Sequence, residues 1–396
     1  MNIQIFDTAI LGAGASGLFA AGLLGARSKV IIEGNKKPGL KILASGGGAC
    51  NFGNQKISGQ NYFGGNPRFC LSALAGFSTA DFKEILNKNH VPYTTRHDGK
   101  IFAQKSSDIL DMLLHRADGA STVFAYDNIV ASAIKNKDIF EISTNKKTFY
   151  AKNLICALGG LTYPALGASG AAYDIARGFG LNITERYPAL TGIIFDDAAA
   201  QDFAPLAGIS CRAKVSCGKN IFTDDILFTH EGLSGPAIFQ ISLYGIKGRQ
   251  VSINFLPDID VAQLLAANKT SPKKISALLH NKLPSRLLQT LLGGNDKQLA
   301  NLNKKEMQEI TEDLNNFTFT VKEINGYDKA EITAGGVDTK EISSKTMQAR
   351  NVPGLYFIGE ALDISGQLGG YNLHWAWASA VACARALNAP PQNKVE

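Results

Sequence analysis

The apolar residues at the start of the chain fall into two short runs on either side of a glycine-rich stretch. The run from Phe6 to Leu11 predicts a buried β-strand, and the run from Lys29 to Ile32 predicts a second one. Between them, small and apolar residues continue from the glycines to about Arg27, which predicts a helix. A strand, a helix and a strand in this order are typical of an α/β fold with a parallel sheet.

The same kind of pattern returns later in the chain, after a section of different character. Residues 148–160 predict a buried strand, and a further strand is predicted to end at Gly359 and Glu360, before a long C-terminal helix. Residues 190–256 instead predict short strands joined by turns. Residues 257–315 contain short helical patterns that start at serine, proline or asparagine. The pattern therefore predicts an α/β sheet interrupted by a β-rich segment and a helical one.

The glycine-rich stretch after the first strand has the spacing of a dinucleotide-binding motif, Gly12-x-Gly14-x-x-Gly17. Glu33 follows 21 positions after the first glycine, at the end of the second strand. Gly12 would permit the tight turn, Gly14 would let the backbone approach a pyrophosphate, and Gly17 would let helix and strand pack closely. The free N–H groups of the helix N-terminus would bind the phosphates, and Glu33 would accept hydrogen bonds from the adenosine ribose. The residues predicted to contact the dinucleotide here are Gly12, Gly14, Ala15, Ser16, Gly17 and Glu33.

Three later segments favour FAD over NAD as the dinucleotide. Residues 34–51, "GNKKPGLKILASGGGACN", form a second glycine-rich loop whose bare backbone could lie against the ribityl chain and the flavin edge. The second segment is the buried strand of residues 148–160, which ends in Ala157-Leu158-Gly159-Gly160. The third is the final strand-to-helix segment, an arrangement typical of glutathione-reductase-like flavoproteins. In these, an acid holds the ribitol hydroxyls and a helix N-terminus faces the flavin pyrimidine, the roles of Glu360 and the turn at Gly369. The further residues predicted to contact FAD are Lys41, Ser45, Gly46, Gly47, Asn51, Gly159, Gly359, Glu360, Gly369, Gly370, Tyr371 and Asn372.

A second complete glycine motif is absent, so the sequence predicts no separate domain for a nicotinamide cofactor. Gly167-x-x-Gly170 follows a proline turn and not a strand. We therefore expect NADH or NADPH to visit the flavin transiently as the reductant. The cysteines lack metal-ligand spacing, and we predict no metal site.

The composition is that of a globular protein with more than one structural unit. The chain has 396 residues, of which 45% are apolar and 19% charged. Its six cysteines form no Cys-x-x-Cys pair, which fits a reducing compartment. Neither a signal peptide nor an apolar run long enough to span a membrane is present. We therefore expect a cytoplasmic protein without membrane contact, while nothing in the sequence indicates the oligomeric state.

Positive charge is concentrated between Val261 and Lys305, although the whole chain carries a formal charge of only +6. Asp296 is the single acidic residue of that segment. One interpretation is a set of solvated helical faces, and the other is a surface for a polyanion such as RNA. No aromatic residues are interleaved with the lysines, so the sequence does not indicate base stacking there. The basic residues are Lys269, Lys273, Lys274, Lys282, Arg286, Lys297, Lys304 and Lys305.

Several segments carry a family resemblance that extends over nearly the whole chain. They are "GAGASG", "SGGGACN", "LTYPALGASG", "THEGLSGP", "TAGGV" and "GQLGGYNLHWAWASA". With these segments the chain resembles the HI0933-like (BaiN/RdsA-type, YhiN) family of FAD-dependent flavoproteins, for which "THEGLSGP" and "TAGGV" are specific. It departs from the family at Leu40 and Ala49, where arginines are usual in "GRK" and "SGGGRCN". FAD binding is expected to survive this loss, an arginine-dependent substrate contact is in doubt, and Lys41 remains as the basic contact.

The resemblance implies an α/β protein in three parts. A split Rossmann-like FAD-binding domain of the glutathione-reductase-like class would comprise residues 1–188 and 333–396. A β-barrel-like domain, residues 189–256 and 316–332, would be inserted into it. This insert would carry a nested helical subdomain, residues 257–315.

The resemblance also implies an oxidoreductase that reduces an activated C=C bond by hydride transfer through flavin N5. The substrate classes that it suggests are a uridine of large-subunit ribosomal RNA, giving dihydrouridine, and dehydro-steroid acids. RNA would then contact the basic residues within 261–305. Two alternatives stay open: an oxidase of amines, aminoketones or alcohols that uses oxygen, and a binding protein in which FAD is structural.

Reduction of the double bond also needs a proton donor on the face opposite the flavin. Cys50 lies in the second glycine-rich loop, His230 in the "THEGLSGP" segment, and His374 in the first turn of the final helix. These three are the candidate catalytic residues. Tyr371 shares the turn of His374, and Tyr163 is a weaker choice.

Overall fold

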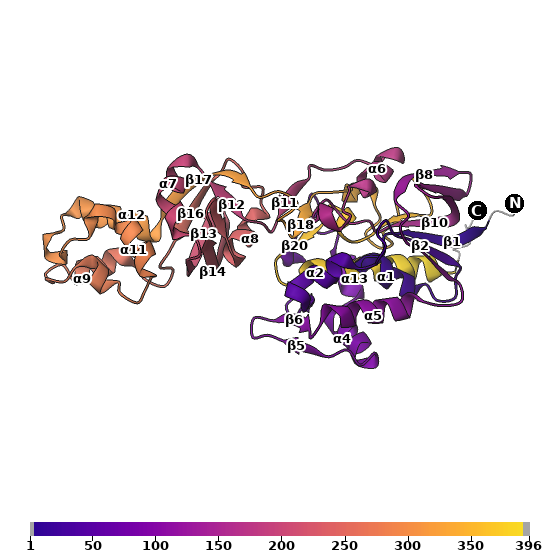
Figure 1. Ribbon diagram of the computed structural model, residues 1–396, viewed down its shortest axis with the longest axis horizontal. Coiled ribbons are helices and arrows are strands. Elements are labelled where there is room, and N and C mark those ends of the chain that lie inside the picture. The colour runs from indigo at the N-terminus through magenta and orange to yellow at the C-terminus, as the bar shows by residue number, and fades with distance from the viewer. Residues whose placement is uncertain (1–3, 391–396) are drawn as a thin grey trace. The chain divides into compact units, whose positions relative to one another are not determined.

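The computed structural model describes residues 4–390 and divides into two compact units (Figure 1). The first unit consists of Met1–Tyr187 and Ile332–Glu396, and the second of Pro188–Glu331. The chain leaves the first unit once and returns to it once, so the second unit is an insertion.

A largely parallel sheet forms the centre of the first unit, in the order β7-β2-β1-β10. β1 (Ile5–Leu11) lies between β2 (Lys29–Ile32) and β10 (Thr148–Cys156) and is parallel to both. β7 (Thr122–Ala125) extends the sheet beyond β2, and β19 (Leu355–Phe357) runs parallel to the C-terminal half of β10. Every residue of β2 is buried, because both faces of a parallel sheet are covered.

The N-terminal half of β10 belongs to an antiparallel meander. β8 (Val130–Asn136) and β9 (Ile139–Thr144) pair with each other, and β9 pairs with β10. The sheet is therefore mixed, with its antiparallel part at one side.

Helices α1 (Ala15–Leu23) and α13 (Tyr371–Asn388) pack side by side, and α5 (Ser106–Ala117) packs on α1 (Figure 1). The prediction that the first helix reaches about Arg27 is wrong, because α1 ends at Leu23 and Gly25 has a φ of +61°. A left-handed residue of this kind commonly ends a helix. The remaining strands and helices of this unit are β3 (Asn51–Asn54), β4 (Tyr62–Phe63), β5 (Tyr93–Thr95), β6 (Lys100–Ala103), β18 (Ile332–Ala334), β20 (Ser365–Gly366), α2 (Leu40–Ala44), α3 (Leu71–Gly76), α4 (Thr79–Lys88) and α6 (Ala171–Gly178), with β11 (Tyr187–Ala189) at its boundary.

The second unit contains a closed barrel of six strands, in the order β12-β15-β14-β13-β16-β17. Buried and exposed residues alternate along much of β13, as expected when one face of each strand lines the barrel interior. Two short helices, α7 (Asp197–Phe203) and α8 (Pro236–Ser242), belong to the same unit. The strands are β12 (Ile193–Phe195), β13 (Ser210–Cys217), β14 (Asn220–Phe228), β15 (Gly232–Ser234), β16 (Gln250–Asn254) and β17 (Phe317–Ile324).

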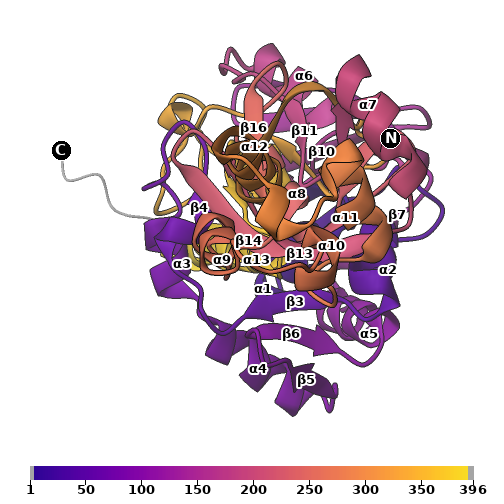
Figure 2. The same cartoon turned by 90° about the vertical axis from the view of Figure 1, so that its left-hand side faces the viewer.

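Four helices are inserted between β16 and β17 and gather at one end of the second unit (Figures 1 and 2). They are α9 (Val261–Ala267), α10 (Ile275–Leu278), α11 (Ser285–Leu292) and α12 (Lys304–Asn315). Apolar side chains of the barrel and of these helices form one continuous core. The predicted fold class, α/β with an inserted barrel and a helical segment, is confirmed. Across residues 4–390, no helix is both long and apolar enough to cross a bilayer.

Candidate flavin site

Four parallel strands of the first unit end at the same edge of the sheet. Leu11 pairs with Ile32 on one side and with Cys156 on the other, and Cys156 pairs with Phe357. In open α/β sheets, ligands bind in the crevice outside the carboxyl ends of the strands. The loops that follow these strand ends carry Gly12, Glu33, Gly159 and Gly359.

The three glycines of the first loop are required for different reasons. Gly12 has a φ of +98°, and a Cβ on it would lie 2.6 Å from the carbonyl oxygen of Ala157. A Cβ on Gly17 would lie 2.0 Å from the carbonyl oxygen of Gly12, so only glycine lets α1 approach β1 this closely. Gly14 has an ordinary φ of −89°, and a Cβ there would meet no atom within 4 Å. The protein itself therefore gives no reason for a glycine at position 14, whereas a ligand against the backbone does.

Backbone N–H groups surround the same position. Among residues 4–390, the N–H groups of Gly14, Ala15, Ser16 and Gly17 have no hydrogen-bond acceptor. They form the N-terminal turn of α1, whose dipole is positive at that end. Unpaired N–H groups beside a glycine that faces open space fit the pyrophosphate of a dinucleotide.

The Glu33 carboxylate is fixed beside this turn. Its Oε2 accepts a hydrogen bond from the N–H of Ala13 at 2.8 Å, and its Oε1 accepts from the N–H and the Nδ2 of Asn35, both at 2.9 Å. The Nδ2 of Asn35 also donates to the carbonyl oxygen of Leu166. Glu33 thus lies at the strand ends, while its contact with an adenosine ribose stays a prediction. The sequence reasoning missed Asn35, which its position directly after the acid and a glycine could have indicated.

The second glycine-rich loop is more ordered than the continuous loop that the sequence predicts. It contains the short helix α2 followed by a 3₁₀ turn, Ser45–Gly48. The turn closes on itself, because the hydroxyl of Ser45 donates to the carbonyl oxygen of Ile42 and the N–H of Cys50 donates to that of Ser45. The glycines of the turn have left-handed φ values of 59°, 66° and 90°, and a Cβ on the second or third would meet no protein atom within 4 Å. They are Gly46, Gly47 and Gly48.

A polar cluster joins four segments of the first unit. Nζ of Lys41 donates to Oγ1 of Thr162 at 2.9 Å and to Oε2 of Glu360 at 2.8 Å. Oε1 of Glu360 accepts from the N–H of Thr333 at 2.9 Å and from the Thr162 hydroxyl at 3.1 Å. The Lys41 ammonium lies 5.7 Å from the centre of the Tyr163 ring. The structure therefore brings the predicted residues Lys41 and Glu360 together. Thr162 and Thr333 were missed, although both lie in family segments.

The predicted turn before α13 is also present. Gly369 and Gly370 have φ values of +119° and +93°, and a Cβ on Gly370 would lie 2.3 Å from the carbonyl oxygen of Gly53. The Asn51 amide, oriented so that both of its ends are satisfied, accepts from the N–H of Gly370 and donates to Gly53 and Ile101 carbonyl oxygens. Asn51 thus holds the second glycine-rich loop against the start of α13.

Two other residues of that turn have partners within the protein. Asn372 binds the backbone of Gly366, accepting from its N–H at 2.7 Å and donating to its oxygen at 2.9 Å. Tyr371 is 8% exposed, and burial raises the pKa of its phenol. The N–H groups of the first turn, rather than these side chains, are the groups of α13 that fit a flavin edge.

The candidate proton donors are not brought together. Cys50 is fully buried, and burial raises the pKa of its thiol to about 11. His374 is 1% exposed, with its Nε2 3.1 Å from the carbonyl oxygen of Phe77. Burial lowers the pKa of His374 to about 4, so its imidazole is neutral near pH 7 and its one proton is engaged with Phe77. His230 is exposed, in the turn between β14 and β15 of the second unit. None of the three has the surroundings typical of a proton donor beside a flavin.

Comparison with known proteins identifies relatives along the full length of the chain. The model of the HI0933-like protein Rossmann domain matches residues 6–386. The ribosomal RNA dihydrouridine synthase of Escherichia coli (strain K12) is 40% identical over 394 residues, which cover 97% of this chain and 98% of that one. The 3-dehydro-bile acid delta(4,6)-reductase of Clostridium scindens is 31% identical over 408 residues, with 95% and 98% covered. A solved structure, the apo Sdh1 complex of Mycobacterium smegmatis, matches with a TM-score of 0.50 and 14% identity, covering 99% of this chain and 70% of that one. This last likeness concerns the fold alone.

Proposed function

The chain belongs to the HI0933-like family of FAD-dependent oxidoreductases, and we propose that it reduces a uridine of large-subunit ribosomal RNA to dihydrouridine. The observation that carries the proposal is the 40% identity to a ribosomal RNA dihydrouridine synthase over 97% of the chain. The first unit supports it with a glycine-lined edge that fits FAD.

The proposed reaction adds a hydride and a proton, in total two electrons and two protons, across the C5=C6 bond of uracil. C6 is conjugated to the C4 carbonyl, so a hydride added at C6 leaves negative charge at C5, which then takes a proton. FAD bound at the strand ends would supply the hydride chemistry at N5, and NADH or NADPH would be the two-electron reductant that restores it. One C–H bond forms at each carbon, and the double bond becomes a single bond.

The residues that would hold FAD come from the edge of the central sheet. The N–H groups of residues 14–17 would bind the pyrophosphate, and Glu33 would bind the adenosine ribose. The polar cluster of Lys41 and Glu360 would face the ribitol hydroxyls. The first turn of α13 would place the positive end of its dipole at the flavin pyrimidine.

NADH or NADPH is proposed as a transient reductant. Within residues 4–390 the structure has one parallel sheet with a glycine motif of the dinucleotide type, the one assigned to FAD. A nicotinamide that reduces the flavin and leaves needs no second sheet of this kind.

RNA is proposed to contact the basic residues within 261–305. Three of these cations have acidic partners: Lys274 with Asp296 at 3.9 Å, Lys297 with Glu306 at 2.6 Å, and Lys305 with Glu309 at 3.6 Å. Lys269 and Arg286 instead donate to backbone carbonyl oxygens. The ones with no partner among residues 4–390 are Lys273, Lys282 and Lys304.

A second candidate substrate is a small molecule with an activated C=C bond. The 31% identity to a bile acid reductase over 95% of the chain favours it, and the chemistry at the flavin would be the same. The greater identity to the RNA-modifying relative makes RNA the first candidate.

The test is anaerobic reduction of the FAD-loaded protein by NADH or NADPH, followed by addition of unmodified large-subunit ribosomal RNA made in vitro. We expect the flavin absorbance to bleach with a nicotinamide and to return with the RNA, and dihydrouridine to appear in the RNA digest. Bleaching without reoxidation by RNA would move the search to small enones. Absence of bleaching with either nicotinamide would contradict the proposal and favour an oxygen-using oxidase.

A further inference from the structure

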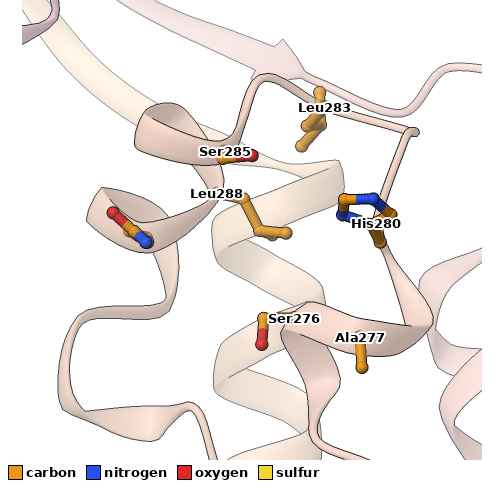
Figure 3. Close-up of a pocket in the computed structure, with 7 residues that line it drawn as sticks. Ser276, Ala277, His280, Leu283, Ser285 and Leu288 are labelled. Carbon is orange, nitrogen blue, oxygen red and sulfur yellow. The ribbon is translucent and has the colours of Figure 1, made fainter.

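The helical part of the second unit contains a cavity of about 420 Å³ that the proposed reaction does not use. It lies between α10, α11 and the turn that joins them (Figure 3). Its walls include Ala277, His280, Leu283, Ser285, Leu288 and Gln289. All of these residues belong to the second unit, whereas the residues that fit FAD belong to the first.

The cavity has an apolar floor and a polar rim. Leu283 and Leu288 are 7% and 4% exposed, and they point into the same space as the His280 ring (Figure 3). The side chains of His280, Ser285 and Gln289 lie at its exposed rim and have no hydrogen-bond partner among residues 4–390. An apolar floor with unpaired donors and acceptors around it suits a flat heteroaromatic ring. His280 also offers an aromatic face of the kind on which unstacked RNA bases pack.

The surroundings of the cavity are positively charged. Residues 273–289 contain four cations and no acidic residue. Lys282 lies in the turn beside His280, exposed and with no partner among the described residues, and the turn is shaped by Asn281, which has a φ of 65°. The nearest acid in the sequence, Asp296, is engaged by the backbone and hydroxyl of Ser276 at 2.9 and 2.8 Å. Ser276 is itself a wall residue, so this one carboxylate lies beside the cavity with Lys274 at 3.9 Å from it, and the four cations outnumber it.

The N-terminus of α11 adds to this field. Pro284 has no N–H, and the N–H groups of Ser285, Arg286 and Leu287 have no acceptor among residues 4–390. Ser285 itself lines the cavity. Unpaired N–H groups at a helix N-terminus attract phosphate oxygens.

We propose that this cavity binds an unpaired nucleobase of the RNA, with the adjoining phosphates beside Lys282 and the N-terminus of α11. The inference rests on the proposed RNA substrate. The base in question anchors the RNA and is a different base from the uridine that is reduced. A ring flanked by phosphates matches the floor, the rim and the charge together. An acidic peptide would match the charge only.

The test uses the full-length, FAD-loaded protein and in vitro transcribed large-subunit ribosomal RNA as the probe. Ala277 is an exposed wall residue, so Ala277→Trp fills the cavity from a position where the fold tolerates a large side chain. We expect RNA affinity to fall at least about fivefold, which corresponds to the loss of one stacked base. The slope of log affinity against log salt should stay unchanged, because no cation is lost. Ala262→Trp, on the exposed face of α9, is the matched control and should change affinity less than twofold.

Lys282→Ala tests the phosphate contact separately. It should weaken binding and reduce the salt slope by about one. Lys219→Ala removes the same charge in the exposed turn between β13 and β14, outside residues 261–305, and should leave the slope as it is. Gln289→Ala is a milder cavity variant that guards against misfolding by Ala277→Trp, and it should weaken binding in the same direction.

Failure of this inference and failure of the proposed reaction give different results. If the wild type forms dihydrouridine and both cavity variants do so with an unchanged KM for RNA, the cavity proposal is wrong. If RNA binding depends on the cavity but no dihydrouridine forms, the cavity proposal stands and the reaction proposal falls. Equal effects of Ala277→Trp and Ala262→Trp would also overturn the cavity proposal.

Discussion

The two glycine-rich loops of the first unit look alike in sequence, but individual glycines in them are needed for different reasons. In the loop after β1, Gly17 is required by close packing, since a Cβ would lie 2.0 Å from the carbonyl oxygen of Gly12. In the loop of residues 45–48, a Cβ on Gly47 would meet no protein atom within 4 Å, but the residue has a left-handed φ of +66°. Gly14 is subject to neither constraint. Close packing thus explains Gly17, and the left-handed backbone explains Gly47. Gly14 has neither explanation and fits a ligand that lies against the backbone.

This difference separates groups that build the site from groups that face the cofactor. A glycine that fills no conformational or packing need fits a bound ligand when it also lies at the strand ends beside unpaired N–H groups, as Gly14 does. The same distinction applies to polar groups, because Asn51 and Asn372 have partners within the protein while the N–H groups of residues 14–17 have none among those described. A substitution at a group that builds the site should therefore lower stability. A substitution at a group that faces the cofactor should lower FAD affinity.

The largest effect on stability is expected from Gly17→Ala. The new methyl group would overlap the carbonyl oxygen of Gly12 and lie 3.3 Å from the Cβ of Ala157, so β1 and α1 must separate. We expect the free energy of unfolding of the apoprotein to fall by about 3 kcal/mol. Urea unfolding without FAD measures it. An apoprotein of unchanged stability would show that the strand and helix are not held this closely.

Gly14→Ala should do the opposite, leaving the apoprotein intact and weakening FAD. Its φ of −89° suits alanine, and the gain from a stiffer unfolded chain roughly offsets the poorer helix cap. We therefore expect apoprotein stability within about 0.5 kcal/mol of the wild type. FAD affinity should fall at least tenfold, or about 1.4 kcal/mol, because the methyl group occupies the space assigned to the pyrophosphate.

Titration of the apoprotein with FAD, followed by flavin fluorescence, measures the affinity. Gly178→Ala, a helical glycine whose Cβ also meets no atom within 4 Å, is a matched control and should leave FAD affinity unchanged. Equal FAD affinities of Gly14→Ala and the wild type would remove the main structural argument for a dinucleotide at this loop.

The sequence predicts this edge well because its determinants are local. The spacing of Gly12, Gly14 and Gly17 and the position of Glu33 follow from a strand, a turn and a helix, and the structure places all four at the strand ends. The short strands of residues 190–256 and the helices of residues 257–315 were likewise predicted from short-range patterns, whereas the barrel was implied by the family resemblance. Contacts between distant segments were not predictable in this way. Thr162 and Thr333 meet Glu360 only because three segments far apart in the sequence, one of them strand β18, converge.

The candidate proton donors also show what local sequence patterns do not reveal, in this case the burial of a side chain. A cysteine and a histidine near a cofactor motif suggest catalysis, but burial decides what they can do. Cys50 and His374 prove to be interior groups, and one sequence contains no signal that distinguishes an interior histidine from one at a site. The fold and the cofactor class were therefore accessible, while the chemistry at the substrate was not.

Gly47→Ala is expected to have an intermediate effect. The methyl group would meet no protein atom, so the cost comes from the left-handed backbone alone, about 1 kcal/mol of the free energy of unfolding. Gly47→Asn should cost less, because asparagine tolerates this conformation. Urea unfolding of the two apoproteins gives the ranking. If FAD lies against the turn, both variants should also lose FAD affinity, with asparagine losing at least as much as alanine. If the two variants differ in stability but both keep the FAD affinity of the wild type, the turn does not contact the cofactor.

The smallest effect on activity is expected from Cys50→Ala, although the residue lies only two positions after the turn of the second loop. The thiol is fully buried with a pKa raised to about 11, so it is a packing group in this structure. Its removal should lower the free energy of unfolding by about 1 kcal/mol through lost packing. The rate at which RNA reoxidises the reduced flavin should stay within twofold of the wild type, measured by anaerobic stopped flow. A general acid contributes roughly a hundredfold or more, so a loss of that size would restore Cys50 as the proton donor. It would also mean that the second loop opens around Cys50 during turnover, and the contrast between the two loops would then have to include motion as well as packing.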